Sequence, residues 1–383
     1  MTAPVASKRA QAGSARGRSQ ARSHAAPPAL VRIVRNGLEE SLHRGDIVEV
    51  DVDGRILRLV GDPDRIVTLR SSVKPFGAIL LLEAGGLEEF DLSPAELAIM
   101  TGSHSGEDVH VRTLQALFRR AGVSQSYLAT GTLNMPLDKL TAARLARDGE
   151  TPGSIRHMCS GQQAVFILLS RLRGWDPQDY WRPDHPSQVA YRDAVARSFG
   201  TEPGRLKTAI DGCGIETFAF PLREVARAFA MLADPSAISK SDPRAGLAGS
   251  LTLIRDAMLA HPEMVGGTHD RVDSSLMKAL PGRVVSKSGA EGLRGMSILS
   301  GSRLGSARTE PSGVAVTIED GDGFDRASAA ASVEALQQAG AIDERALREL
   351  GRYHRPPMVD PRGEVVGEAI PDFELAPVGE LIP

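Results

Sequence analysis

Runs rich in β-branched and apolar residues predict strands toward both ends of the chain. Leu30–Val34, Asp46–Val50 and Arg55–Val60 have this composition near the amino end, and it is typical of β-strands. Asp53-Gly54, between the last two runs, favours a tight hairpin turn. Strand signals then largely stop, and they return at Arg283–Ser286, Gly295–Leu299 and Val314–Ile318.

The middle of the chain has patterns typical of helices. Ser93-Pro94-Ala95-Glu96 combines a capping box with a proline at the first helical position. Gly122 and Gly174 follow two further helical patterns and are typical of helix ends. We expect helices at Val109–Ala121, Ser160–Arg173, Pro186–Phe199, Pro221–Leu232, Leu247–Ala260, Ser274–Ala279 and Arg326–Ala339. Strands at both ends around a helical middle predict an α+β fold, with one sheet built from both termini and an inserted helical lobe.

Composition and charge exclude several classes of protein. The chain has 383 residues, of which 42% are hydrophobic and 24% charged, as in ordinary soluble globular proteins. A net charge of −3 and an aromatic content of 4% argue against a protein that binds nucleic acid through basic patches or stacked bases. Two cysteines cannot build a disulfide scaffold. No apolar run has the roughly 18 residues of a membrane span, and no glycine-rich phosphate loop follows a strand.

The amino-terminal segment differs in composition from the rest of the chain. Met1–Pro28 is rich in Ala, Ser and Arg, and the first acidic residue is Glu39. This composition is typical of an organelle transit peptide or of a disordered cytosolic tail, and the lack of an amphipathic face favours the tail. We therefore expect a disordered basic tail over residues 1–28 of a cytoplasmic protein, followed by a single unit over residues 29–383. In that unit we expect sheet parts at about 29–70 and 281–350, a helical part at about 71–280, and an irregular tail over Asp360–Pro383.

The first candidate for chemistry is the pair Ser71 and Lys74. The Ser-x-x-Lys spacing puts a hydroxyl and an amine one helical turn apart on the same face. A buried lysine beside another cation can lose its proton near neutral pH and activate the serine. The pattern alone is also typical of a solvated helix start, but the apolar run Pro75–Leu80 that follows favours a buried turn.

A second candidate lies at the end of the predicted strand Arg283–Ser286. Lys287-Ser288-Gly289 follows it, and a Lys-Ser/Thr-Gly strand downstream of a Ser-x-x-Lys helix is the arrangement of penicillin-recognising serine acylases. Ser103 and Ser105, in between, match the middle Ser-x-Asn element of that superfamily, although Ser105 could equally cap a helix that starts at Glu107. Ser103 near Lys287 would form a second serine–lysine pair.

Cys159 and Cys213 each lie near a glycine at a predicted turn. A lone cysteine is most often a small buried apolar residue. Two cysteines at turns could also face each other as thiolate metal ligands, but two thiolates do not complete a zinc site, and no histidine pair at i, i+4 spacing assists them.

Taken together, these residues resemble the rhizobial-type L-asparaginases, also called the bacterial asparaginase II family. The resemblance covers the chain from about Val31 to Val378. It is carried by Arg70-Ser71-Ser72-Val73-Lys74-Pro75, Ser103-His104-Ser105-Gly106-Glu107, Cys159-Ser160-Gly161, Gly174-Trp175, His185-Pro186-Ser187-Gln188, Asp211-Gly212-Cys213, Phe218-Ala219-Phe220-Pro221-Leu222, Lys287-Ser288-Gly289-Ala290-Glu291-Gly292 and Glu319-Asp320-Gly321-Asp322-Gly323. The resemblance implies a serine β-lactamase-like fold with an antiparallel sheet, and hydrolysis of L-asparagine to L-aspartate and ammonia by a single catalytic unit.

The resemblance also implies roles for individual residues. Ser71 would be the nucleophile and Lys74 its base, with Ser103 and Lys287 as a second serine–lysine tandem. Cys159, Asp211 and Cys213 would border the substrate pocket, where the family binds zinc through the two cysteines and a lysine. The other pocket residues expected on this basis are Gln162, Glu216, Ser288 and Gly289.

The chain departs from the family pattern around this pocket. Gln162 replaces the metal-binding lysine, Gln163 replaces a histidine, and Glu216 stands where proline is common. A glutamine carbonyl is a poor zinc ligand beside soft thiolates. We therefore expect that no cofactor is required, with Cys159 and Cys213 as the candidate ligands if zinc binds.

Two other functions remain open at this stage. The same serine–lysine machinery could serve an amidase or acyltransferase that acts on a larger amide metabolite, because fold and nucleophile do not fix the substrate. A non-catalytic binding or sensor protein would need a broken nucleophile or base, whereas all four catalytic groups are present. A β-lactamase or penicillin-binding protein would leave the cysteine motifs without a role. The expected partner is a small amide substrate, with no nucleic acid or membrane, and a homodimer is the commonest assembly of soluble enzymes.

Overall fold

The computed structural model describes residues 26–305, 309–322 and 326–379. Most of the predicted amino-terminal tail, and Gly323 of the last family motif, lie outside these residues. The strands are β1 (Ala29–Arg35), β2 (Leu38–Asp51), β3 (Ile56–Val60), β4 (Ile66–Thr68), β5 (Lys207–Ile210), β6 (Glu216–Pro221), β7 (Val284–Ser288), β8 (Arg294–Ile298), β9 (Ser312–Ile318), β10 (Pro357–Val359), β11 (Val365–Pro371) and β12 (Ala376–Pro377).

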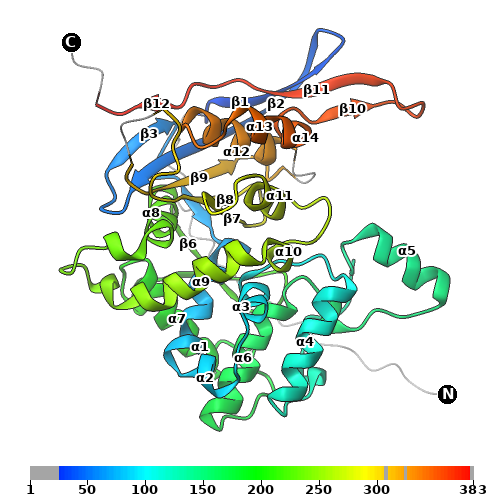
Figure 1. Ribbon diagram of the computed structural model, residues 1–383, viewed down its shortest axis with the longest axis vertical. Helices are drawn as coiled ribbons and strands as arrows, with labels where there is room; N and C mark the ends of the chain where they lie inside the picture. The colour runs from blue at the N-terminus through cyan, green and yellow to red at the C-terminus, as the bar shows by residue number, and fades with distance from the viewer. Residues whose placement is uncertain (1–25, 306–308, 323–325, 380–383) are drawn as a thin grey trace, which may run out of the picture.

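The main sheet is antiparallel and takes its strands from both ends of the chain. Its order is β10-β11-β1-β2-β9-β8-β7, and β3 joins it by pairing with β2 and β12. Figure 1 shows this sheet in the upper part of the molecule, above a lobe of helices. The helical lobe is inserted between β3 and β7 in the sequence, so the predicted α+β fold class is confirmed.

Helices cover both faces of the sheet, and β2 contributes side chains to each face. Ile47 packs in the core beneath α12 (Ala327–Gln338), whereas its neighbour Val48 packs in the larger core that includes α8 (Leu222–Ala233), as strand alternation requires. α8 packs closely against β8 and β9: a Cβ atom added at Gly295 or Gly313 would collide with α8. These glycines let the helix approach the sheet backbone.

The helical lobe surrounds α1 (Lys74–Glu83), in which nine of the ten residues are buried. The predicted capping box is present, because Ser93 and Glu96 exchange hydrogen bonds at the start of α3. The other helices are α2 (Gly86–Glu89), α3 (Pro94–Thr101), α4 (Asp108–Arg120), α5 (Lys139–Asp148), α6 (Ser160–Arg173), α7 (Pro186–Ser198), α9 (Ala248–Ala260), α10 (Pro262–Val265), α11 (Val272–Ala279), α13 (Glu344–Glu349) and α14 (Gly351–His354). None of the helices in the described residues is long and apolar enough to cross a membrane.

Two regions differ from the sequence-based expectation. A small second sheet, β4-β6-β5, forms, and two of its strands, β5 and β6, lie within the part expected to be helical. Asp360–Pro383 was expected to be irregular, but β11 pairs with β1 over Val31–Val34 and β12 pairs with β3. β4, β5 and β12 have at most four residues each, so their identity depends on distant partners more than on local composition.

Candidate active site

Ser71 lies on a wall of an open cleft of about 610 Å³. It belongs to a 3₁₀ turn, Arg70–Val73, which leads directly into α1. Among the described residues, the Ser71 hydroxyl makes no hydrogen bond, so it is free to meet a ligand. The cleft is lined by Ser71, Ser103, Leu137, Met158, Asp270, Arg271, Ser288, Gly289, Ala290, Glu291, Gly292, Leu293, Asp320, Gly321, Asp322 and Ser328.

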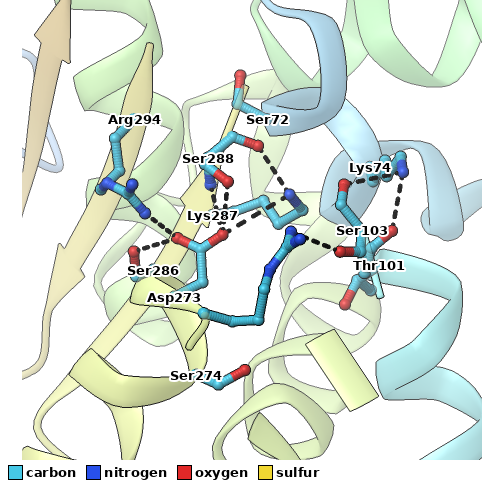
Figure 2. Close-up of polar contacts among 12 residues, drawn as sticks. Ser72, Lys74, Thr101, Ser103, Asp273, Ser274, Ser286, Lys287, Ser288 and Arg294 are labelled. Carbon is cyan, nitrogen blue, oxygen red and sulfur yellow. Dashed lines mark hydrogen bonds and ion pairs between the residues drawn. The ribbon is translucent and has the colours of Figure 1, made fainter. Parts of the chain in front are cut away.

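Lys74 is the first residue of α1, and its side chain is 1% exposed. Its Nζ donates to Gly102 O at 2.8 Å, and lies 3.0 Å from Ser103 Oγ and 3.3 Å from Cys159 Sγ. Figure 2 shows the contact with Ser103. The hydrogen-bonded serine–lysine pair of this site is therefore Ser103 with Lys74, whereas the motifs had suggested Ser103 with Lys287.

Lys287 lies on β7 and is fully buried. Its Nζ donates to the carbonyl oxygen of Ser288 at 2.7 Å and lies 3.9 Å from a carboxylate oxygen of Asp273. Burial lowers the pKa of Lys287 to about 7, with Lys74 adding to this effect and Asp273 opposing it. A lysine in this state can gain or lose a proton near neutral pH.

Sequence reasoning missed two charged residues of this region, Arg271 and Asp273. Arg271 lines the cleft, and its guanidinium donates to Ser103 O at 2.8 Å. Asp273 lies in the first turn of α11, where it contacts β7 and β8. Neither residue belongs to a recognisable motif, and the predicted helix began one residue after Asp273, so no local signal indicated them.

The two cysteines converge behind the cleft. The ligand atoms of Cys159, Asp211 and Cys213 all lie within 4.8 Å of one another. The hydrogen bond with Cys213 lowers the pKa of the Cys159 thiol well below its usual value, and the Lys74 ammonium adds to this, whereas the pKa of Cys213 is raised. The buried cysteine pair thus favours one thiolate beside one thiol.

These three side chains fit part of a zinc site. Two sulfurs and one carboxylate oxygen at this separation match the three protein ligands that zinc uses when its fourth position is open. Cys159, Asp211 and Cys213 would hold the ion, and zinc there would act as a Lewis acid. Two basic side chains already occupy this region, because Lys74 contacts Cys159 and Arg70 pairs with Asp211.

Gln162 and Glu216 are buried, but neither is among the residues that line the cleft. The Gln162 amide donates to the Tyr191 hydroxyl at 3.3 Å. Glu216 forms an ion pair with Arg192 at 3.1 Å, and burial raises its pKa. Of the predicted pocket residues, Ser288 and Gly289 line the cleft directly.

Comparison with known proteins now identifies the class. The family model described as L-asparaginase II matches residues 31–371. The chain belongs to the L-asparaginase II family. It is an amidohydrolase that acts on a linear amide.

Among solved structures, the chain is similar to two glutaminases at low identity. A probable glutaminase from Bacillus subtilis, complexed with 6-diazo-5-oxo-L-norleucine, is 12% identical over 78% of this chain and 85% of that chain, with a TM-score of 0.38. A Bacillus glutaminase in the presence of 4.3 M NaCl is 13% identical over 78% of this chain and 92% of that chain, with a TM-score of 0.41. These similarities are too distant to indicate a substrate. Comparison with curated proteins finds no match.

Proposed function

We propose that the protein is an L-asparaginase that hydrolyses L-asparagine to L-aspartate and ammonia through Ser71. One observation carries the proposal. Ser71 and Ser103 line one cleft, and the buried amine of Lys74 lies 3.0 Å from the Ser103 hydroxyl.

The reaction follows from the chemistry of these groups. Ser71 Oγ attacks the side-chain amide carbon and gives its proton to the amine of Lys74, whose position one turn later puts it on the same face. The proton then passes through Ser103, 3.0 Å from Lys74, to the departing nitrogen. The carbon–nitrogen bond breaks and ammonia leaves. Water hydrolyses the resulting ester, which releases aspartate and restores the Ser71 hydroxyl.

The negative oxygen of the tetrahedral intermediate needs N–H donors. The N–H groups of Ser288 and Gly289 are already used, because they donate to Asp273 and to Leu293 O. We therefore assign this role to the N–H of Ser71 itself.

The charges around the cleft suit a free amino acid. Arg271 is the cation of the lining, and a guanidinium is well matched to a carboxylate. We assign it to the α-carboxylate of the substrate. The carboxylates of Glu291 and Asp320, also in the lining, face the same space and suit the α-ammonium group.

The test is ammonia release from the purified protein with L-asparagine and then L-glutamine, beside Ser71→Ala. We expect asparagine turnover that is lost in the variant, without added metal. A folded protein that releases no ammonia from asparagine, even with added zinc, would contradict the proposal.

The size of the cleft favours a second candidate function. A volume of about 610 Å³ is in the range of pockets that hold much larger ligands than asparagine. A serine-dependent amidase or acyltransferase acting on a larger amide metabolite would use the same residues. Turnover of N-substituted asparagine amides that exceeds turnover of asparagine itself would establish this alternative.

A further inference from the structure

The buried carboxylate of Asp273 connects α11 to two strands of the main sheet. One oxygen accepts from Ser286 Oγ at 2.7 Å and from the Arg294 guanidinium. The other accepts from the N–H and the hydroxyl of Ser288 at 2.9 and 2.7 Å. Figure 2 shows these contacts converging on one side chain.

This geometry fixes the end of β7. Ser286 and Ser288 share one face of the strand, so a single carboxylate holds both. Lys287 belongs to the opposite face, yet its Nζ turns back around the strand end to reach Ser288 O and to lie 3.9 Å from Asp273. The position of the Lys287 ammonium therefore depends on the same carboxylate that fixes the strand.

The charges around Lys287 are unbalanced without Asp273. The charged groups that act on it are Lys74 from α1, Arg271 from the cleft wall, Arg294 from β8, and Asp273. Three of them are cations, and Lys287 itself is fully buried. Asp273 is the anion of this set, and it stays ionised because Arg294 and Lys287 outweigh the burial that raises its pKa.

We propose that Asp273 is a positioning residue for amide hydrolysis: it holds Ser288 in the cleft wall and Lys287 buried beside it, and it keeps the Lys287 ammonium charged during turnover. This inference rests on the proposed function and adds to it a role for charged Lys287, the neighbour of Ser288 in the cleft lining. Asp273 acts through Lys287 and does not touch the substrate.

The test compares pH profiles of kcat for Asp273→Asn and Arg294→Gln. Loss of the carboxylate lowers the pKa of Lys287, so the basic limb of the profile moves to lower pH. A shift of about one unit from the wild-type value of about 7 reduces the charged fraction about ninefold at pH 8 and about twofold at pH 6. Loss of the competing cation Arg294 moves the limb to higher pH.

A matched control separates charge from stability. Asp46 is also a buried carboxylate, with 1% exposure and an arginine partner, Arg65, but it lies on β2 outside the cleft. Asp46→Asn lowers stability and leaves the pH profile in place. If Asp273→Asn does not fold, Arg294→Gln still tests the inference through the direction in which it moves the basic limb of the pH profile.

A second measurement does not depend on activity, so it distinguishes failure of this inference from failure of the proposed function. The pKa of Lys287 is followed by NMR of isotope-labelled lysine, and its signal is assigned by its loss in Lys287→Met. Opposite shifts in the two variants support the inference, even if the wild type hydrolyses no asparagine. A Lys287 pKa that stays at the wild-type value in both variants, or that shifts equally in Asp46→Asn, would overturn it.

Discussion

Replacing Lys74 by methionine separates the activity of the enzyme from its stability. The side chain is 1% exposed and makes three polar contacts. Removing a general base lowers kcat by about 10²- to 10⁴-fold, or about 3 to 5 kcal/mol of barrier. Replacing a buried charge by an apolar residue of similar volume is often stabilising by about 1–4 kcal/mol. Leaving Gly102 O without its donor costs about 1–3 kcal/mol. These effects oppose each other, so we expect Lys74→Met to fold with stability within about 2 kcal/mol of wild type.

The assay is ammonia release in steady state, with urea unfolding of the same samples. Lys278→Met is the matched control, because Lys278 is an exposed lysine on α11, and its loss leaves kcat within about twofold. Folded Lys74→Met with kcat within tenfold of wild type would refute the assignment of Lys74 as base.

The contact between Ser103 and Lys74 can be tested in the same assay. If Ser103 acts through Lys74, the double variant Ser103→Ala with Lys74→Met loses no more activity than Lys74→Met alone. Losses that multiply would instead show independent roles.

Three further predictions follow from the structure. Arg271→Ala raises KM for asparagine about 10- to 100-fold, because a hydrogen bond to a charged group contributes about 1.5–3 kcal/mol. The effect on kcat is smaller. An unchanged KM would show that Arg271 does not bind the substrate. Chelation leaves asparagine turnover intact, because Lys74 and Arg70 already contact Cys159 and Asp211, the residues that would hold the ion. Activity that is lost on chelation and restored by zinc would contradict this, and the metal content of the protein measures occupancy directly. Arg303→Met lowers the free energy of unfolding by about 3–5 kcal/mol at pH 7, because it leaves Glu49 buried with one cation fewer. Burial raises the pKa of Glu49, but Arg303 and Arg58 outweigh burial, so the pKa is lowered overall. The ion pair therefore stabilises the fold above about pH 4.5, and this stabilisation is lost as the pH falls through the pKa of Glu49 in the folded state. The urea unfolding curves of the variant and the wild type should therefore converge in acid.

Local sequence signals predicted the elements whose start and end are encoded within a few residues. α6 begins at Ser160 and ends at Arg173, as expected from the glycine that follows, and α3 has the expected capping box. β5 and β11 carried no such signal. All four residues of β5 are exposed, and β11 exists because β1 lies beside it. Pairing of this kind depends on the whole fold, so a window of sequence does not contain it.

In the candidate site, too, some residues were predictable from local motifs and others were not. The short motifs around Ser71 and Ser288 led from the sequence to residues that line one cleft. The partners of the lysines were not predictable, because the side-chain rotamers and the crossing of chain segments decide that Lys74 meets Ser103. Asp273 had no motif, since its contacts are with Ser286, Ser288 and Arg294, which lie on the distant strands β7 and β8.

The position of β1 between β2 and β11 has a consequence for biosynthesis. Val31 pairs with Pro371, so one edge of β1 has no partner on the ribosome until β11 has been made. Unpaired strand edges favour association with other chains. Since the strand that carries Lys287 belongs to the same sheet, we expect the nascent chain to acquire its amidohydrolase activity late in translation, and nascent chains that stop before β11 to aggregate rather than to work as a shorter enzyme.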